Sequence, residues 1–260
     1  MSVQRQAQAF YLSSELQTAA VKPFTISATS ALDLLLDSFY CNCTVETQDR
    51  AALVTAMTIS GQSLFASDKG FPLVGFLSDN NFAIEGINAL GLTIATNQVF
   101  SITVDHLFNT ALGVTNPFGF SISTAPTDIT ISPNESGSLL NFVYGLGAVD
   151  VAGGAEATLE GVCLRDDVFL GRLIMDVDNA NKGLIQITSI KVDGIELLSA
   201  QTPSISPTLI HQFLPSSNDK SGLQLNYLVK QNSRVSVSVK NVDVPANTAK
   251  VAAGIYCKAI

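Results

Sequence analysis

The sequence predicts an all-β protein whose two halves are similar β-sandwiches. Residues 184–198 read LIQITSIKVDGIELL, in which apolar and polar residues alternate on both sides of Asp193-Gly194. Alternation interrupted by Asp-Gly is a strong short-range signal for a β-hairpin. Residues 53–65, LVTAMTISGQSLF, follow the same plan, with Ser60-Gly61 in the turn. A hairpin that occurs twice indicates that a larger unit has been duplicated.

The spacing of a second pair of segments supports this duplication. The two hairpins lie 133 positions apart, and the alternating strands FSITV (100–104) and VSVSV (235–239) lie 135 apart. Because this period is far longer than that of solenoids or propellers, the repeated unit is a whole domain. We therefore predict an N-terminal arm at residues 1–22, a first domain at 23–130 and a second domain at 131–260.

Short strands separated by turn residues fill both halves, at intervals of about 8–12 residues that are typical of sandwiches and barrels. The expected strands of the first half are residues 24–28, 32–36, 39–45, 53–65, 71–77, 82–84, 90–95, 100–104 and 118–123. Those of the second half are residues 140–146, 155–164, 168–177, 184–198, 208–214, 223–229, 235–239 and 251–259. Residues 125–138, rich in polar residues and proline, mark the boundary.

About eight strands in about 130 residues suit the jelly roll, in which two packed antiparallel sheets bury the inward side of each alternating strand. An immunoglobulin-like pair is the alternative, although the chain has no tryptophan for the Cys–Trp–Cys framework of that fold. The predicted fold class is therefore all-β, with two tandem eight-stranded jelly-roll β-sandwiches and an N-terminal arm or short helix.

The N-terminal residues 2–20 could form a helix, because Ala7, Phe10, Leu12 and Leu16 could share one face. An extended arm is the alternative, since Gln-rich N-termini are often ordered only by contacts. In either form we expect this segment to stand outside the duplicated pattern. The chain shows no apolar core of signal-peptide length and no run of about 20 apolar residues, so we expect synthesis and assembly inside a cell.

The composition argues against nucleic-acid binding through a basic surface. The net charge is −8, only 14% of residues are charged, and no run of basic residues occurs. Binding to phosphates requires clustered Lys or Arg, so no direct sequence-specific nucleic-acid contact is predicted. A surface with so little charge favours tight oligomerisation, although Ser- and Thr-rich surfaces are also ordinary in all-β proteins.

No catalytic or cofactor-binding residue is predicted. His106 and His211 are the only histidines, and neither lies near a recognisable nucleophile motif. The glycines of Gly145-Leu-Gly147 and Gly153-Gly154 could suggest a phosphate loop, but neither a P-loop lysine nor a following helix pattern is present. We expect these glycines to permit tight turns and close packing of strands instead.

No metal site is predicted either. The turn that contains Asp176 and Asp178 begins like a calcium loop, but the terminal Glu of an EF-hand is missing, which favours a polar hairpin tip. The cysteines do not have zinc-binding spacing, and we expect buried free thiols, as in a reducing cytoplasm. They are Cys41, Cys43, Cys163 and Cys257.

The paired hairpins ITSIKVDGIELL and VTAMTISGQSLF, together with VSVSV and FSITV, resemble the tandem plan of double jelly-roll major capsid proteins. These proteins belong to icosahedral viruses with an internal membrane, and the corticovirus-type and flavobacterial single-stranded-DNA phage members come closest in size. The resemblance spans about residues 23–260 and transfers no functional residue. It implies a non-enzymatic structural protein that assembles in the host cytoplasm as homotrimers, which tile the virion capsid as pseudo-hexagons.

The resemblance also implies partners. These are neighbouring capsomers, penton or minor capsid proteins, and an internal membrane reached through the N-terminal arm, whose only basic residues are Arg5 and Lys22. Two other functions are considered. A tandem carbohydrate-binding or adhesin module requires exposed aromatic residues, whereas the 14 Phe and 5 Tyr mostly occupy expected core positions. A β-sandwich hydrolase requires two facing carboxylates, which the sequence does not identify.

Overall fold

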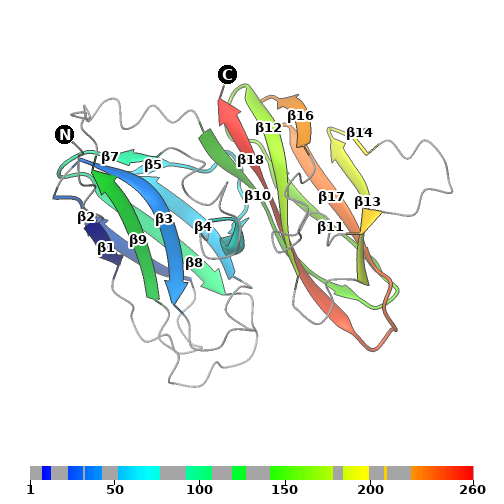
Figure 1. Cartoon of the computed structure of the whole chain (residues 1–260). Coiled ribbons are helices and arrows are strands. Elements are labelled where there is room, and N and C mark those ends of the chain that lie inside the picture. The colour runs from blue at the N-terminus through cyan, green and yellow to red at the C-terminus, as the bar shows by residue number, and fades with distance from the viewer. Residues whose placement is uncertain are drawn as a thin grey trace, which may run out of the picture.

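The computed structural model describes residues 8–12, 23–31, 33–42, 52–76, 92–106, 119–126, 141–177, 184–198, 208–209 and 224–259. Within these ranges, all regular structure is β apart from one short 3-10 helix, η1 (Leu73–Phe76). Figure 1 shows two β-sandwiches side by side, the first built from the N-terminal half of the chain and the second from the C-terminal half. The predicted all-β fold class is confirmed.

The first half contains two antiparallel sheets. One sheet has the order β1 (Gln8–Leu12), β9 (Gly119–Pro126), β3 (Leu34–Asn42) and β7 (Thr93–Ile94). The other has the order β2 (Phe24–Thr29), β8 (Val99–His106) and β4 (Ala52–Ile59), and β4 also pairs with β5 (Gln62–Ser63) and β6 (Phe71–Pro72).

The second half repeats this arrangement. One sheet has the order β10 (Asn141–Ala152), β18 (Thr248–Ala259), β12 (Val168–Val177) and β16 (Gln224–Val229). The other has the order β11 (Glu156–Val162), β17 (Arg234–Asn241) and β13 (Ile185–Val192), and β13 also pairs with β14 (Ile195–Glu196) and β15 (Thr208–Leu209).

The two halves have the same jelly-roll topology. When the short hairpin strands β5 and β14 are set aside, each half has eight strands in the described residues. Their order is first–eighth–third–sixth in one sheet and second–seventh–fourth–fifth in the other, which is the double Greek-key pattern of a jelly roll. An immunoglobulin-like pair is therefore excluded, and the tandem jelly-roll prediction is confirmed.

The duplicated hairpins have the same turn geometry. Ser60 and Gly61 have φ values of 48° and 83°, and Asp193 and Gly194 have the same two values. Positive φ at both central residues is the signature of a type I′ turn, whose twist matches that of the flanking strands. The sequence signal that placed a turn at each of these dipeptides is therefore confirmed in its backbone detail.

An irregularity of the sheets is also duplicated. The pairing of β4 with β8 shifts register between Val54 and Ala56, and the pairing of β13 with β17 shifts between Ile187 and Ser189. These positions are 133 residues apart. Bulges are structural devices that add twist to a strand, so finding one at the same place in both halves is strong evidence for a common origin.

The turn before the seventh strand of each half provides a third matching feature. Asn97 and Asn232, 135 positions apart, have φ values of 66° and 67°. The Asn97 amide donates to the Ser30 carbonyl, and the Asn232 amide donates to the Cys163 carbonyl, each at 2.8 Å. Asparagine tolerates the left-handed region better than most residues, which explains its presence at both turns.

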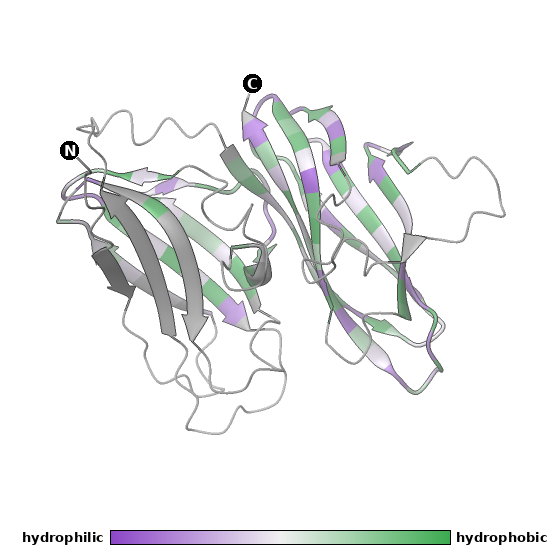
Figure 2. Ribbon diagram, in the orientation of Figure 1, coloured by the Kyte–Doolittle hydropathy of each residue, from purple (hydrophilic) through white to green (hydrophobic). Residues whose placement is uncertain are grey.

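Alternation along the strands builds the two cores. Val235, Val237 and Val239 of β17 are fully buried, as are Phe100, Ile102 and Val104 of β8. Figure 2 shows this alternation as hydrophobic and hydrophilic bands along the strands of the second half. Because successive residues of a strand face opposite sides of the sheet, period-two patterning places one side of each strand in the core.

Some local predictions are wrong. Residues Gln8–Leu12 are not helical: they form β1, which pairs with β9 as β10 pairs with β18. This part of the N-terminal segment therefore belongs to the duplicated pattern and not to an arm outside it. The reason is that pairing with β9 satisfies the backbone polar groups of QAFYL, which overrides a weak helix propensity.

Two further boundaries differ from the prediction. The expected strands 32–36 and 39–45 are one strand, β3, with a register shift against β9, and the end of the expected strand 71–77 is helix η1. The expected strand 82–84 and the proposed domain boundary at residues 130 and 131 lie outside the described residues.

We predict that Gly194→Val destabilises the protein by about 1–2 kcal/mol, since a branched residue is strained at positive φ. A Cβ at Gly194 would have no neighbour within 4 Å, so the effect would come from the backbone alone. Urea denaturation measures it, and Gly194→Asn is the control that should lose less stability. Equal stability of the valine variant and the unmodified protein would show that this turn is wrongly described.

Candidate functional site: the contact between the two halves

Residues 64–70 of the first half form a docking segment that is hydrogen-bonded to the second half. The Ala66 amide donates to the Val143 carbonyl at 2.8 Å, and the Val143 amide donates to the Leu64 carbonyl at 3.1 Å. Phe65 and Val143 consequently form a parallel β-bridge. The docking segment thus extends the edge of the sheet that begins with β10.

The docking segment also reaches the end of β11. The Leu164 amide donates to the Ala66 carbonyl at 2.8 Å, and the Asp68 amide donates to the Val162 carbonyl at 3.3 Å. A last backbone bond joins the Gly147 amide to the Gly70 carbonyl at 3.0 Å. Because it bonds to both β10 and the end of β11, the segment closes the open side of the second sandwich where its two sheets meet.

Glycines of the second half make this close approach possible. A Cβ on Gly145 would lie 2.0 Å from the Lys69 carbonyl oxygen. Gly254, which pairs with Gly145 across β10 and β18, has Phe71 against it, and a Cβ there would lie 2.4 Å from that ring. The expectation that Gly145 permits close packing of backbone is confirmed, and this role accounts for it without a phosphate loop.

The contact is apolar as well as hydrogen-bonded. Val143 and Ile174 belong to strands of the second half but are buried in the core of the first half, whereas Ala66 is buried in the core of the second. The Phe71 ring lies 5.4 Å from the Tyr256 ring, centroid to centroid, and the Tyr256 hydroxyl donates to the Gly75 carbonyl. The packing of the two halves therefore resembles a domain interior more than a loose contact between domains.

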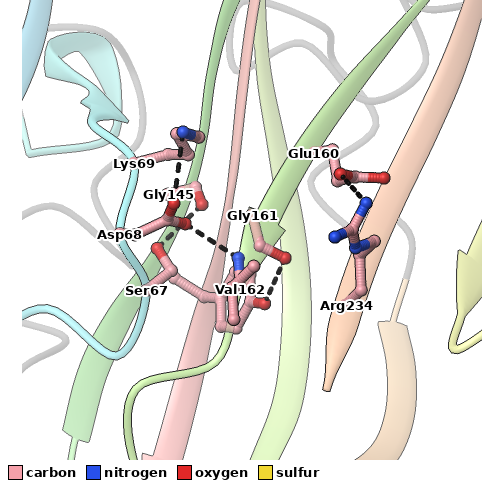
Figure 3. A network of polar contacts seen from close by, with 9 residues as sticks. Ser67, Asp68, Lys69, Gly145, Glu160, Gly161, Val162 and Arg234 are labelled. Atoms are coloured by element: carbon pink, nitrogen blue, oxygen red, sulfur yellow. Dashed lines mark hydrogen bonds and ion pairs between the residues drawn. The ribbon is translucent and has the colours of Figure 1, made fainter. Parts of the chain in front are cut away.

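A polar network lies at the centre of the contact (Figure 3). The buried Ser67 hydroxyl donates to the Gly145 carbonyl at 2.8 Å, and the Val162 amide donates to Asp68 Oδ1 at 2.8 Å. Lys69 forms an ion pair with the Asp68 carboxylate at 3.1 Å. The Ser67 bond satisfies a buried hydroxyl, which would otherwise stay unpaired at a cost of about 1–3 kcal/mol, whereas Asp68 and Lys69 are exposed to solvent.

Desolvation at the contact raises the pKa of Asp68, but the Val162 amide and the Lys69 ammonium together have a larger effect in the opposite direction. The net result is a pKa below the ordinary value of an aspartic acid. Asp68 is therefore ionised wherever the protein is folded near neutral pH, and its charge strengthens the hydrogen bond across the contact.

Arg165 holds the other end of the docking segment. Its guanidinium donates to the Ser63 carbonyl at 2.5 Å and to the Phe65 carbonyl at 3.4 Å, and it lies 4.0 Å from the centre of the Phe142 ring. Burial lowers the pKa of Arg165. Its planar set of donors suits two carbonyl groups that lie two residues apart on one segment, which a lysine could not match.

In the part of the chain that the structure describes, the other candidate residues are not brought together into a site. His106 ends β8 and His211 lies outside the described residues, as does Asp178, while Asp176 lies in β12. Within the ranges that the structure describes, no group of three or more His, Cys, Asp or Glu could hold a metal ion. The same ranges contain no helix long and apolar enough to cross a membrane.

The prediction of buried free thiols is confirmed for Cys163 and Cys257. Burial raises the pKa of both thiols, which keeps them protonated and unreactive near neutral pH. Cys41 lies in β3, and Cys43 lies outside the described residues. The two buried thiols act as small apolar groups of the second core.

The docking segment was not predicted. Leu64 and Phe65 end the expected hairpin and residues 66–70 follow as an expected loop, and only long-range pairing gives this segment its hydrogen bonds to the second half. Two signals were available: small residues between two apolar runs, and the glycines at positions 145 and 254 within expected strands. Neither signal identifies the segment that packs there, because the sequence alone does not show which backbone approaches a glycine closely.

No protein-family model matches the chain, and no curated protein sequence matches it significantly. Among solved structures, the chain is similar to the major capsid protein P2 from bacteriophage PM2, with a TM-score of 0.43 and 8% sequence identity. The alignment covers 97% of this chain and 97% of the phage protein.

We predict that Gly145→Ala weakens the contact between the halves, because its Cβ would collide with the Lys69 carbonyl, which belongs to backbone and cannot move alone. Overpacking of this kind costs about 1–3 kcal/mol. Urea denaturation and limited proteolysis within residues 64–70 should both show the loss. Gly154→Asn, at a turn with φ of 76° and no neighbour within 4 Å, is the control that should change little.

We also predict that Asp68→Asn makes the stability of the protein less dependent on pH in the acid range. Since the folded pKa of Asp68 is lowered, its contribution is complete above the unfolded pKa of about 4 and is lost as the pH falls through the folded value. The variant should thus be less stable than the unmodified protein at pH 7, with the difference vanishing at low pH.

The measurement is thermal unfolding between pH 2 and pH 7, which spans about two units below and about three units above the ordinary aspartate pKa. Asp166→Asn, at an exposed position between β11 and β12, is the matched control. A difference between Asp68→Asn and the unmodified protein that stays constant over the whole range would contradict an electrostatic role for Asp68.

Proposed function

We propose that the protein is a structural protein, the major capsid protein of a virion, which forms homotrimers that tile an icosahedral shell as pseudo-hexagons. The observation that carries this proposal is the contact between the two halves. It joins the docking segment of one jelly roll to the β10 edge of the next, so the two halves contribute different surfaces. A contact between unlike surfaces is heterologous, and heterologous contacts generate rings when the rotation closes.

A tandem chain of this kind suits a ring of six similar sandwiches. Within each chain, the docking segment of the first half binds the β10 edge of the second half. The corresponding segment of the second half and the corresponding edge of the first half are then available to neighbouring chains. If each contact rotates the next sandwich by about 60°, three chains close a ring with three-fold symmetry and an approximately hexagonal outline. Hexagonal tiles of this kind pack side by side into a shell, which is the arrangement that the sequence resemblance implies.

The surface chemistry also supports a structural role. Only 14% of residues are charged, and a chain with so little surface charge gains by covering its surface with copies of itself. The remaining parts of the proposal are assembly in the host cytoplasm, contacts with neighbouring capsomers and with penton or minor capsid proteins, and an internal membrane approached by the N-terminal residues.

No specific observation favours the alternative of a carbohydrate-binding or adhesin module. Sugar-binding faces of β-sandwiches require exposed aromatic rings. The large hydrophobic side chains that are exposed in the described part of the chain are all aliphatic: Val99, Leu164, Ile195, Leu228, Val242 and Val244.

We predict that the purified protein sediments with the mass of three chains or of a larger multiple of three, and that electron micrographs show three-fold tiles with six similar lobes. Buried contacts between unlike surfaces should hold the trimer at micromolar concentration. A stable monomer at that concentration, measured by analytical ultracentrifugation at physiological salt, would contradict the proposed function.

A further inference from the structure

We propose that β1 of the first half is the docking edge for a second copy of this chain, which inserts Leu197 and Leu198 of its second half there. Within one chain, residues Leu64 and Phe65 occupy the corresponding edge of β10. This inference rests on the proposed function, since it names the surfaces through which one chain meets the next. It follows from the duplication of both the docking segment and the edge.

Leu197 and Leu198 follow the second hairpin at the positions that Leu64 and Phe65 have after the first hairpin. The Leu64 amide donates to the Met57 carbonyl at 2.9 Å, and the Leu197 amide donates to the Ile190 carbonyl at 2.7 Å. Donors and acceptors are each 133 positions apart. The chain therefore leaves the second hairpin at the same point as the docking segment leaves the first hairpin, and with the same hydrogen bond.

The two pairs of residues differ in burial. Leu64 is fully buried and Phe65 is 6% exposed, in a core that includes Val143 and Ile174 of the second half. Leu197 and Leu198 pack against the second core but are only partly buried. Within a single chain, two apolar residues of the second half thus lack part of the cover that their counterparts have.

The edge that would receive them is also duplicated. β1 and β10 each begin a sheet and each pair with the last strand of their half, β9 and β18. β10 carries the docking segment on its other side. In the described residues, β1 has β9 as its one partner strand, and an edge strand is a template for another chain.

The registers of the sheets show which residue of β1 corresponds to Val143. Phe39 of β3 and Leu173 of β12 are 134 positions apart, and they pair with Ile122 and Ile255 respectively. These two isoleucines in turn pair with Phe10 in β1 and Tyr144 in β10. Ala9 therefore occupies the position of Val143.

Within a chain, Val143 forms a parallel bridge with Phe65. The residue equivalent to Phe65 in the second half is Leu198, and the residue equivalent to Val143 in the first half is Ala9. The proposed contact thus places Leu198 of one copy beside Ala9 of another.

The occupant is a second copy because Leu197 and Leu198 of the same chain lie far from this edge. Figure 1 shows β1 and β14, the strand that precedes Leu197, at opposite ends of the pair of sandwiches. The two surfaces can therefore meet only between chains. Repetition of the contact from chain to chain is the arrangement that closes a ring.

The two contacts are not identical, and the difference gives them separate roles. The counterparts of Gly145 and Gly254 in the registers of the first half are Tyr11 and Ser121, so the close backbone approach of the internal contact is not available between copies. We therefore expect the contact between copies to be weaker and to form after each chain has folded.

Disulfide trapping tests this placement. The double variant Ala9→Cys, Leu198→Cys is oxidised with copper phenanthroline, and covalently linked chains are counted on a non-reducing gel. Residues opposite each other in a β-bridge lie within reach of a disulfide. We expect linked dimers and trimers from the double variant, and none from either single variant. Ala9→Cys with Ile195→Cys is the matched control, since Ile195 is 56% exposed on the same hairpin.

A second variant covers the case in which the cysteines themselves disturb the edge. Leu198→Glu should lower the trimer fraction at least tenfold at micromolar concentration while the melting temperature of the isolated chain stays within a few degrees. Ile195→Glu should leave the trimer intact. Trimers that persist in Leu198→Glu, or a double variant that forms trimers without linked chains, would overturn this inference and leave the proposed function standing. An unmodified protein that stays monomeric would overturn both.

Discussion

The contact between residues 64–70 and the β10 edge determines how the whole chain is organised. It converts two separate sandwiches into one unit by sharing backbone hydrogen bonds, apolar side chains and a central polar network. Two jelly rolls joined only by a linker would move relative to each other, because contacts between domains are usually small. Here Val143 and Ile174 of one half complete the core of the other, which fixes the relative placement of the halves.

The duplication explains why this contact has a direction. Two copies of one domain could meet through the same surface on each, and such a contact would be complete within the chain. This chain instead uses a docking segment from one copy and an edge strand from the other. Because the two surfaces are unlike, each half still has one surface with which the contact can be repeated between chains. Glycines at positions 145 and 254 make the internal contact closer than a repeat between chains can be.

Much of the fold was predictable because its signals are local. The type I′ turns at Ser60-Gly61 and Asp193-Gly194, and the alternation in β8 and β17, are encoded in adjacent residues and appear where the sequence placed them. The pairing of Gln8–Leu12 was not predictable in this way, because a short segment with helix-forming neighbours becomes a strand only when β9 lies beside it. Long-range partners decided that element.

The candidate site was unpredictable for the same reason. Nothing adjacent to Asp68 indicates that the Val162 amide will donate to it from 94 residues away. The glycines were noticed, and the interpretation of close packing was correct at Gly145, but the packed partner was not identifiable. Sequence patterns show which strand faces are apolar, whereas the choice of which edge meets which segment depends on the assembled topology.

Hydrogen exchange of the amides that cross the contact tests the central claim most directly. The amides of Ala66, Val143, Gly147 and Leu164 all donate between the halves. If the two jelly rolls are held as one unit, these amides should exchange as slowly as those within β17 and β18, in the isolated chain as well as in the assembly. Exchange at the rate of an open loop, with the strands of both sandwiches still protected, would show that the halves are independent and would contradict this account.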